Sequence, residues 1–170
     1  MSAPPVGGSF TLVDHHHNRV TEASYRGKYV LLFFGFTHCR QVCPAALLTL
    51  STALDLLGPL ATDVRALYVT VDPERDSSEV LRGFLSEYPR FTGLTGSAEQ
   101  VDVAKRAFRV FARRAEDPED PEGYAMPHTA FSYLLDRDGR YAAHFTDALE
   151  AAEIAARIRT QLTGWVRSRG

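Results

Sequence analysis

The chain has 170 residues, of which 45% are hydrophobic and 24% charged, and its formal net charge is −2 at pH 7. This length fits one ordinary domain with a sizeable core, and the composition is that of a soluble globular protein, which excludes intrinsic disorder. The nearly neutral charge gives no general affinity for nucleic acid, and a total of two cysteines excludes a disulfide-scaffold protein.

The N-terminal residues show no export or membrane signal. Residues 1–9, MSAPPVGGS, lack the basic start and the apolar stretch of a signal peptide. We expect them to form a flexible segment ahead of a single domain at residues 10–170. The longest apolar run, YVLLFFGF at residues 29–36, is far shorter than the roughly 20 residues of a membrane-spanning helix. Composition does not separate a natural cytoplasmic start from the cut end of an anchored protein.

The first half of the chain alternates strand and helix patterns. Residues 9–14 and 18–24 indicate two short strands joined by a polar turn, an N-terminal β-hairpin. The continuous apolar run at 29–36 is typical of a strand that is buried on both faces. Beyond it, leucines at helical spacing predict a helix over 45–58, and a β-branched apolar run predicts a strand over 64–72.

The second half contains three helix-start signals and one hairpin. The turn RDG separates two runs that we expect to pair as strands, residues 128–136 and 140–145. Each of the three predicted helices opens on a capping-box pair. These pairs are Asp76 with Glu79, Ser97 with Gln100, and Asp147 with Glu150.

This order of elements predicts an α/β fold of the thioredoxin-like type. Strands alternate with helices, and the chain closes with a hairpin and a final helix, which indicates a mixed central sheet flanked by helices. A first core strand also leads directly into a pair of cysteines at the start of a helix. No internal repeat or second-domain linker appears in the sequence.

The cysteine pair is the strongest chemical signal in the sequence. Cys39 and Cys43 lie in FTHCRQVCP, and residues four apart project from the same helix face. At a helix N-terminus the partial positive charge favours thiolate over thiol. Such a pair can form a disulfide, cycle as a dithiol or bind a soft metal such as Cu(I) or Zn. The alternative is two buried, inert thiols.

A third ligand could come from one of six histidines. His128 is the best candidate, because it begins a strand after a long loop, and a thioredoxin-like fold places such a residue opposite the cysteine helix. His38 adjoins Cys39 but should point away from it, and His144 is expected to be structural or exposed. The run of histidines at 15–17 favours a solvated turn, although it could gather metal weakly.

Four ordered blocks resemble the Sco/SenC family of copper-binding proteins. The blocks are FFGFTHCRQVCP, YVTVDPERDSSEVLRGFL, FTGLTGSAEQVDVAKRAFRV and HTAFSYLLDRDGRYAAHF, and together they cover most of the chain. The resemblance implies a thioredoxin-like fold and one copper ion, bound as Cu(I) or Cu(II). Carried over by position, the copper ligands are Cys39, Cys43 and His128.

The resemblance also implies a role in assembling cytochrome c oxidase. Family members help to mature the binuclear copper site of that enzyme, by delivering copper, by reducing its cysteines, or both. The implied partner is the copper-site subunit of the oxidase or another copper chaperone, and we expect a monomer. The implied location is the periplasm or the outer face of a bacterial membrane, reached through an anchor that this chain lacks.

Two residues depart from the family pattern. Arg40 replaces the proline that usually follows the first cysteine, and Pro127 replaces the aspartate that usually precedes the histidine. Proline at this position also resembles the cis-proline of thioredoxin-like oxidoreductases. A thiol–disulfide oxidoreductase that uses Cys39 and Cys43 as its redox pair therefore remains an alternative. A thiol peroxidase is a further one, because Thr37 stands two residues before a cysteine.

The acidic residues of VDPERD have two readings. Asp72 and Asp76 match an acidic stretch of the family and could act in the copper site. Their simpler interpretation is a turn residue and a helix N-cap.

Overall fold

The computed structural model of the chain describes residues 6–38, 42–116, 118, 124–125 and 131–168. Its strands are β1 (Thr11–Asp14), β2 (Arg19–Thr21), β3 (Tyr29–Gly35), β4 (Val64–Thr70), β5 (Phe91–Thr95), β6 (Ala115–Glu116), β7 (Tyr124–Ala125), β8 (Phe131–Leu135) and β9 (Tyr141–Thr146). Its α-helices are α1 (Val42–Leu56), α2 (Ser78–Phe84), α3 (Ala98–Ala107) and α4 (Ala151–Ser168). Short 3-10 helices are η1 (Glu22–Tyr25), η2 (Gly58–Asp63) and η3 (Leu85–Glu87).

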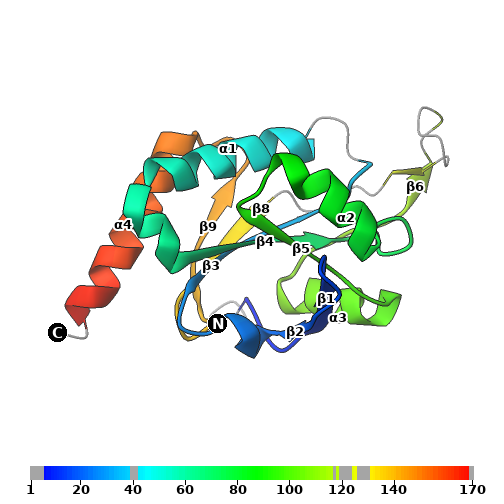
Figure 1. Cartoon of the computed structure of the whole chain (residues 1–170), viewed down its shortest axis with the longest axis horizontal. Coiled ribbons are helices and arrows are strands. Elements are labelled where there is room, and N and C mark those ends of the chain that lie inside the picture. Colours follow the sequence, from blue (N-terminus) through cyan, green and yellow to red (C-terminus); the bar gives the residue numbers. More distant parts are fainter. Residues whose placement is uncertain (1–5, 39–41, 117, 119–123, 126–130, 169–170) are drawn as a thin grey trace, which may run out of the picture.

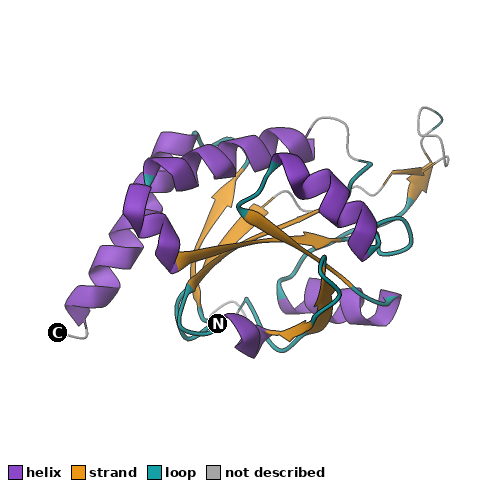
Figure 2. Cartoon of the chain, viewed as in Figure 1, coloured by secondary structure: helices purple, strands orange, loops and turns teal. Residues whose placement is uncertain are grey.

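Seven strands form one mixed sheet in the order β2-β1-β5-β4-β3-β8-β9. The central strands β3, β4 and β5 are parallel, whereas β8 pairs with β3, and β1 with β5, in antiparallel register. Figures 1 and 2 show α1, α2 and α4 on one face of this sheet and α3 on the other. The expected mixed sheet, flanking helices and N-terminal β-hairpin are therefore confirmed.

Two hydrophobic cores hold the layers together, one on each face of the sheet. All seven residues of β3 are buried, because helices cover both faces of this strand. Its side chains alternate between the two cores: Leu31 and Phe33 pack toward α1 and α4, and Leu32 and Phe34 pack toward α3. The continuous apolar run in the sequence is explained by this double burial.

The helix boundaries confirm one expected cap and correct another. Ser97 and Gln100 form the predicted capping box at the start of α3. The cap of α2, however, is Ser77, whose hydroxyl accepts a hydrogen bond from the Val80 amide. The prediction that Asp76 opens this helix was therefore wrong by one residue. The last helix, α4, begins at Ala151, later than the expected start near Asp147.

None of the helices in the described residues is both long and apolar enough to cross a bilayer.

The N-terminal segment at residues 1–9, which we expected to be flexible, is only partly described, because its first five residues lie outside the described part of the chain. The Gly7 amide donates a hydrogen bond to the Ala107 carbonyl at 2.7 Å.

Candidate functional site

The cysteine motif lies between the end of β3 and the start of α1. β3 ends at Gly35 and α1 begins at Val42, so the backbone of Cys43 belongs to the first turn of the helix. Cys39 and Arg40 lie outside the described residues, as does the side chain of Cys43. The expected passage from a buried strand into a helix N-terminus is thus confirmed. At such a position the helix dipole favours a thiolate.

His128 and Pro127 also lie outside the described residues. The first described strand after them is β8. β8 begins at Phe131, three residues after His128, and Ser132 pairs with Phe33 in the antiparallel register with β3. The start of β8 and the end of β3 therefore share one edge of the sheet. The approach of His128 to the two cysteines stays a prediction.

A buried carboxylate anchors the strand end that leads into the cysteine motif. Asp76 is completely buried, and its Oδ1 accepts a hydrogen bond from the Thr37 hydroxyl at 2.6 Å. Its Oδ2 accepts two more, from the Thr37 amide at 3.0 Å and from the Thr70 hydroxyl at 2.7 Å. Thr37 stands two residues before Cys39. The backbone entering the motif is therefore held through both the main chain and the side chain of one residue.

The same burial controls the ionisation of Asp76. Desolvation raises the pKa of this carboxyl above its usual value, and the nearby charge of Asp72 raises it further. The hydrogen bonds from Thr37 and Thr70 oppose this shift, because they stabilise the charged form. Asp76 is thus neither an exposed N-cap nor an ordinary surface acid, and its described contacts are structural.

Asp72 forms the turn predicted for it and a buried ion pair as well. The Asp72 carbonyl accepts hydrogen bonds from the amides of Arg75 and Asp76, at 3.2 and 3.0 Å. Its carboxylate meets the Arg75 guanidinium, with Nε and Oδ2 2.5 Å apart and both side chains only 3% exposed. The Asp72 amide in turn donates a hydrogen bond to the Thr70 hydroxyl oxygen at 2.9 Å. This loop is therefore a rigid support beside the cysteine motif.

His38 and His144 belong to no group of three potential metal ligands among the described residues. His38 contacts the preceding residue, with its Nδ1 3.4 Å from the Thr37 hydroxyl oxygen. His144 is exposed on β9, and its Nδ1 lies 2.5 Å from the Tyr141 hydroxyl. Within the described ranges, no three residues of the types His, Cys, Asp and Glu come together as a metal site.

The three consecutive histidines form the turn between β1 and β2. His15 Nδ1 accepts a hydrogen bond from the Gly93 amide at 2.9 Å, which leaves the proton of neutral His15 on Nε2. That Nε2 lies 3.1 Å from Nε2 of His16, whereas Nε2 of His17 pairs with Glu79 at 3.0 Å. A protonated Nε2 does not ligate a metal ion, so His15 is structural here. This agrees with the simpler expectation for this run.

We predict that His15 makes the protein less stable in mild acid. Burial lowers the pKa of His15, the charges of His16 and Arg82 lower it further, and Asp14 opposes them. The unfolded chain therefore takes up the proton first, so the free energy of unfolding should fall as the pH drops below about 6.5 and level off below the folded pKa. Urea titrations at several pH values would measure this slope. His15→Asn, whose Oδ1 takes the place of Nδ1 and can still accept from the Gly93 amide, should flatten it, and an unchanged slope in this variant would contradict the prediction.

The sequence pattern missed the roles of Thr37 and Thr70. Both threonines stand at the carboxyl ends of neighbouring parallel strands, since Gly35 pairs with Thr70 in the register of β3 and β4. Polar residues at such ends meet at one edge of a sheet, so their position after apolar runs could have indicated the Asp76 contacts.

Comparison with known sequences gives relatives over nearly the whole chain. The sequence model of the SCO1/SenC family matches residues 1–163. The mitochondrial SCO1 homolog of Homo sapiens is 38% identical over 162 residues, which is 94% of this chain and 54% of that protein. A SCO2-like protein of Rickettsia prowazekii is 35% identical over 88% of this chain and 73% of its own length. The chain thus spans about half the length of the human relative.

Comparison with solved structures gives the same family. ScoI of Bradyrhizobium japonicum, solved with copper bound, is 38% identical and superposes with a TM-score of 0.82. The match covers 91% of this chain and 98% of that one. The thioredoxin-like fold expected from the order of the elements is confirmed by this likeness.

Proposed function

The chain belongs to the SCO1/SenC family, and on that premise we propose that it is a copper-binding metallochaperone that helps to mature the binuclear copper site of cytochrome c oxidase. The observation that carries this proposal is the likeness to copper-bound ScoI, which extends over 91% of the chain at 38% identity. The function belongs to the domain at residues 10–170.

The proposed ligands of the single copper ion are Cys39, Cys43 and His128. Thiolates are soft ligands that select Cu(I), and an imidazole suits either copper oxidation state. The fold supports this set, because the strand before Cys39 ends at the sheet edge where the strand after His128 begins. Copper is the cargo of this site. The reduced pair binds the ion, and exchange of ligands with a partner passes it on.

The proposed partner is the copper-site subunit of the oxidase or another copper chaperone. Both would meet this chain, as a monomer, in the periplasm or at the outer face of the bacterial membrane. Delivery requires an acceptor whose own thiols are reduced, because a disulfide on either side removes ligands from the exchange.

We predict that reduced protein binds one copper ion per chain and that His128→Ala lowers the affinity by about tenfold to a hundredfold. Titration against a coloured Cu(I) chelator would measure both quantities. The matched control is His144→Ala, which removes an exposed histidine on β9 and should bind copper like the wild type. An unchanged stoichiometry and affinity in His128→Ala would reject the three-ligand site.

A second candidate function is thiol–disulfide exchange on partner cysteines. The observation that favours it is the placement of Cys43 in the first turn of α1, where a thiolate is stabilised. This activity requires Cys39 and Cys43 but no imidazole. It therefore predicts turnover of a disulfide substrate that persists in His128→Ala and stops in Cys39→Ser, and no turnover by the wild type would exclude it.

A further inference from the structure

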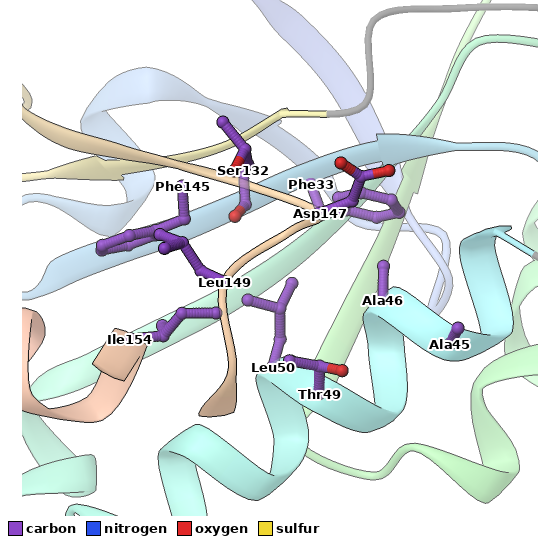
Figure 3. A pocket seen from close by; sticks show the side chains of 11 residues that line it. Phe33, Ala45, Ala46, Thr49, Leu50, Ser132, Phe145, Asp147, Leu149 and Ile154 are labelled. Atoms are coloured by element: carbon purple, nitrogen blue, oxygen red, sulfur yellow. The ribbon is translucent and has the colours of Figure 1, made fainter. Parts of the chain in front are cut away.

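A mainly apolar pocket opens beside the first turns of α1. Its volume is about 270 Å³, and it lies between α1 and the adjoining parts of β8, β9 and the start of α4 (Figure 3). Aromatic and aliphatic side chains form most of its lining, among them Phe33, Leu50, Phe145, Leu149 and Ile154.

The pocket continues the helix face that carries Cys43. Residues three and seven positions apart share one face of an α-helix, and the residues at these distances from Cys43 are Ala46 and Leu50. Both line the pocket, as does Ala45. The two alanines leave space there because their side chains are small. A group seated in the pocket therefore lies beside the helix turns that follow the backbone of Cys43.

Polar atoms with unused hydrogen-bonding capacity face this space. Ser132 is 5% exposed, its hydroxyl points into the pocket, and no hydrogen bond joins that hydroxyl to another described residue (Figure 3). Because this oxygen is not one of the fully buried atoms that lack a partner, it is reached from the pocket and is open to a donor seated there. The carboxylate of Asp147 lies at another part of the lining. Among the described residues, no ion pair joins this carboxylate to a basic side chain.

We propose that this pocket seats one large apolar side chain of the partner segment that presents cysteines to Cys39 and Cys43, with a basic residue of that segment next to Asp147. This inference rests on the proposed function and names how the partner is held. The lining holds one carboxylate and no basic residue among its eleven members, so charge complementarity selects a cationic neighbour. The Ser132 hydroxyl would accept an N–H, which favours an indole over an aliphatic group.

The dimensions favour a protein side chain over a free small molecule. Pockets for drug-sized ligands measure about 300–1,000 Å³ and enclose most of the ligand. This pocket, at about 270 Å³, lies at the lower limit of that range, and its volume suits a single aromatic anchor, the kind of residue that dominates protein interfaces. An anchor at this place brings the segment's own cysteines close to the start of α1.

The test uses two synthetic peptides that differ at one residue. They are acetyl-GCGWRG-amide and acetyl-GCGARG-amide, titrated into reduced, copper-free, ¹⁵N-labelled protein and followed through amide shifts at Thr49, Ser132 and Asp147. We expect the tryptophan peptide to bind at least about tenfold more tightly than the alanine peptide, because only it buries a large apolar side chain. Equal binding of the two peptides would overturn the inference.

Two variants with a matched control locate the binding. Thr49→Phe fills the pocket and should weaken the tryptophan peptide by about tenfold or more, whereas Thr52→Phe makes the same change on an exposed part of α1 and should leave binding within about twofold. Asp147→Asn, a rim change that spares the core, should weaken binding by a few fold at low salt. Wild-type binding in Thr49→Phe and Asp147→Asn would reject the pocket as the site.

Two further measurements distinguish the proposed anchor pocket from a small-molecule site and from the proposed copper function. Free indole that binds as tightly as the tryptophan peptide would show a small-molecule site and overturn the proposal of a partner segment. Copper titration of Thr49→Phe should give the wild-type stoichiometry, because the pocket holds no copper ligand. A wild-type protein that binds the tryptophan peptide but no copper would refute the proposed function and leave the anchor pocket standing.

Discussion

Serine substitution of Cys39 or of Cys43 is expected to lower the affinity of the reduced protein for copper by about three orders of magnitude. A serine hydroxyl stays protonated at neutral pH and is a hard, weak ligand, whereas a thiolate at a helix N-terminus is charged and soft. The double variant should retain no binding in competition with a Cu(I) chelator. This effect should exceed that of His128→Ala, because each cysteine supplies both the negative charge and the softness of the site.

The control for these variants is a measurement of their stability, which shows whether they still fold. Each should unfold in urea near the wild-type midpoint, because α1 begins at Val42 and its packing against the sheet uses later residues of the helix. Prior oxidation of the wild type to the disulfide should abolish copper binding to the same extent as the double substitution. One-to-one binding by the double variant at the wild-type affinity would refute the cysteine site.

Alanine substitution of Asp76 is expected to cost about 3–4 kcal/mol of folding free energy. The change removes the acceptor of three hydrogen bonds and leaves the amide of half-buried Thr37 without this partner. In a chain of this length, the loss corresponds to a melting temperature lower by roughly 10 °C. The matched control is Asp55→Ala, which removes an exposed ion pair with Arg90 and should cost less than about 1 kcal/mol.

Asparagine at position 76 should behave differently from alanine. Its amide oxygen can accept from the Thr37 amide and the Thr70 hydroxyl, and its amino group can donate to the Thr37 hydroxyl. Because burial raises the pKa of Asp76, the folded state favours the protonated acid, and this contribution to stability is lost as the pH rises through the folded pKa. The stability of Asp76→Asn relative to the wild type should therefore increase from about pH 4 upward and then level off. A constant difference in stability across this pH range would contradict the raised pKa of Asp76.

The elements that the sequence predicted best are those with one dominant signal. β3 matched an uninterrupted apolar run, and α3 matched a capping box whose two side-chain contacts are both present. β5 was missed because its five residues, FTGLT, contain a glycine and two threonines and show no apolar run. This strand is defined by its neighbours, since it lies between β4 and β1 in the sheet.

The sequence predicts the chemistry of the candidate site, but it did not predict what supports that site. Spacing and the preceding strand point to Cys39 and Cys43 as its thiolates, which stays a prediction. The function of Asp76 was misassigned because a carboxylate three residues before Glu79 has the local pattern of a cap. Only the tertiary fold brings it to Thr37, which is 39 positions away in the chain. Local patterns report contacts between near neighbours and do not report such distant pairs.

The contacts of Thr37 also bear on the proposed exchange of copper. Both its amide and its hydroxyl are bound to one buried carboxylate, so the chain is preorganised up to this residue before any metal arrives. The anchoring of Thr37 therefore adds no ordering cost of its own when the proposed site takes up copper. Under the proposed function, uptake and release would leave the sheet and the Asp76 contacts in place, which suits a carrier that must surrender its cargo as readily as it takes it.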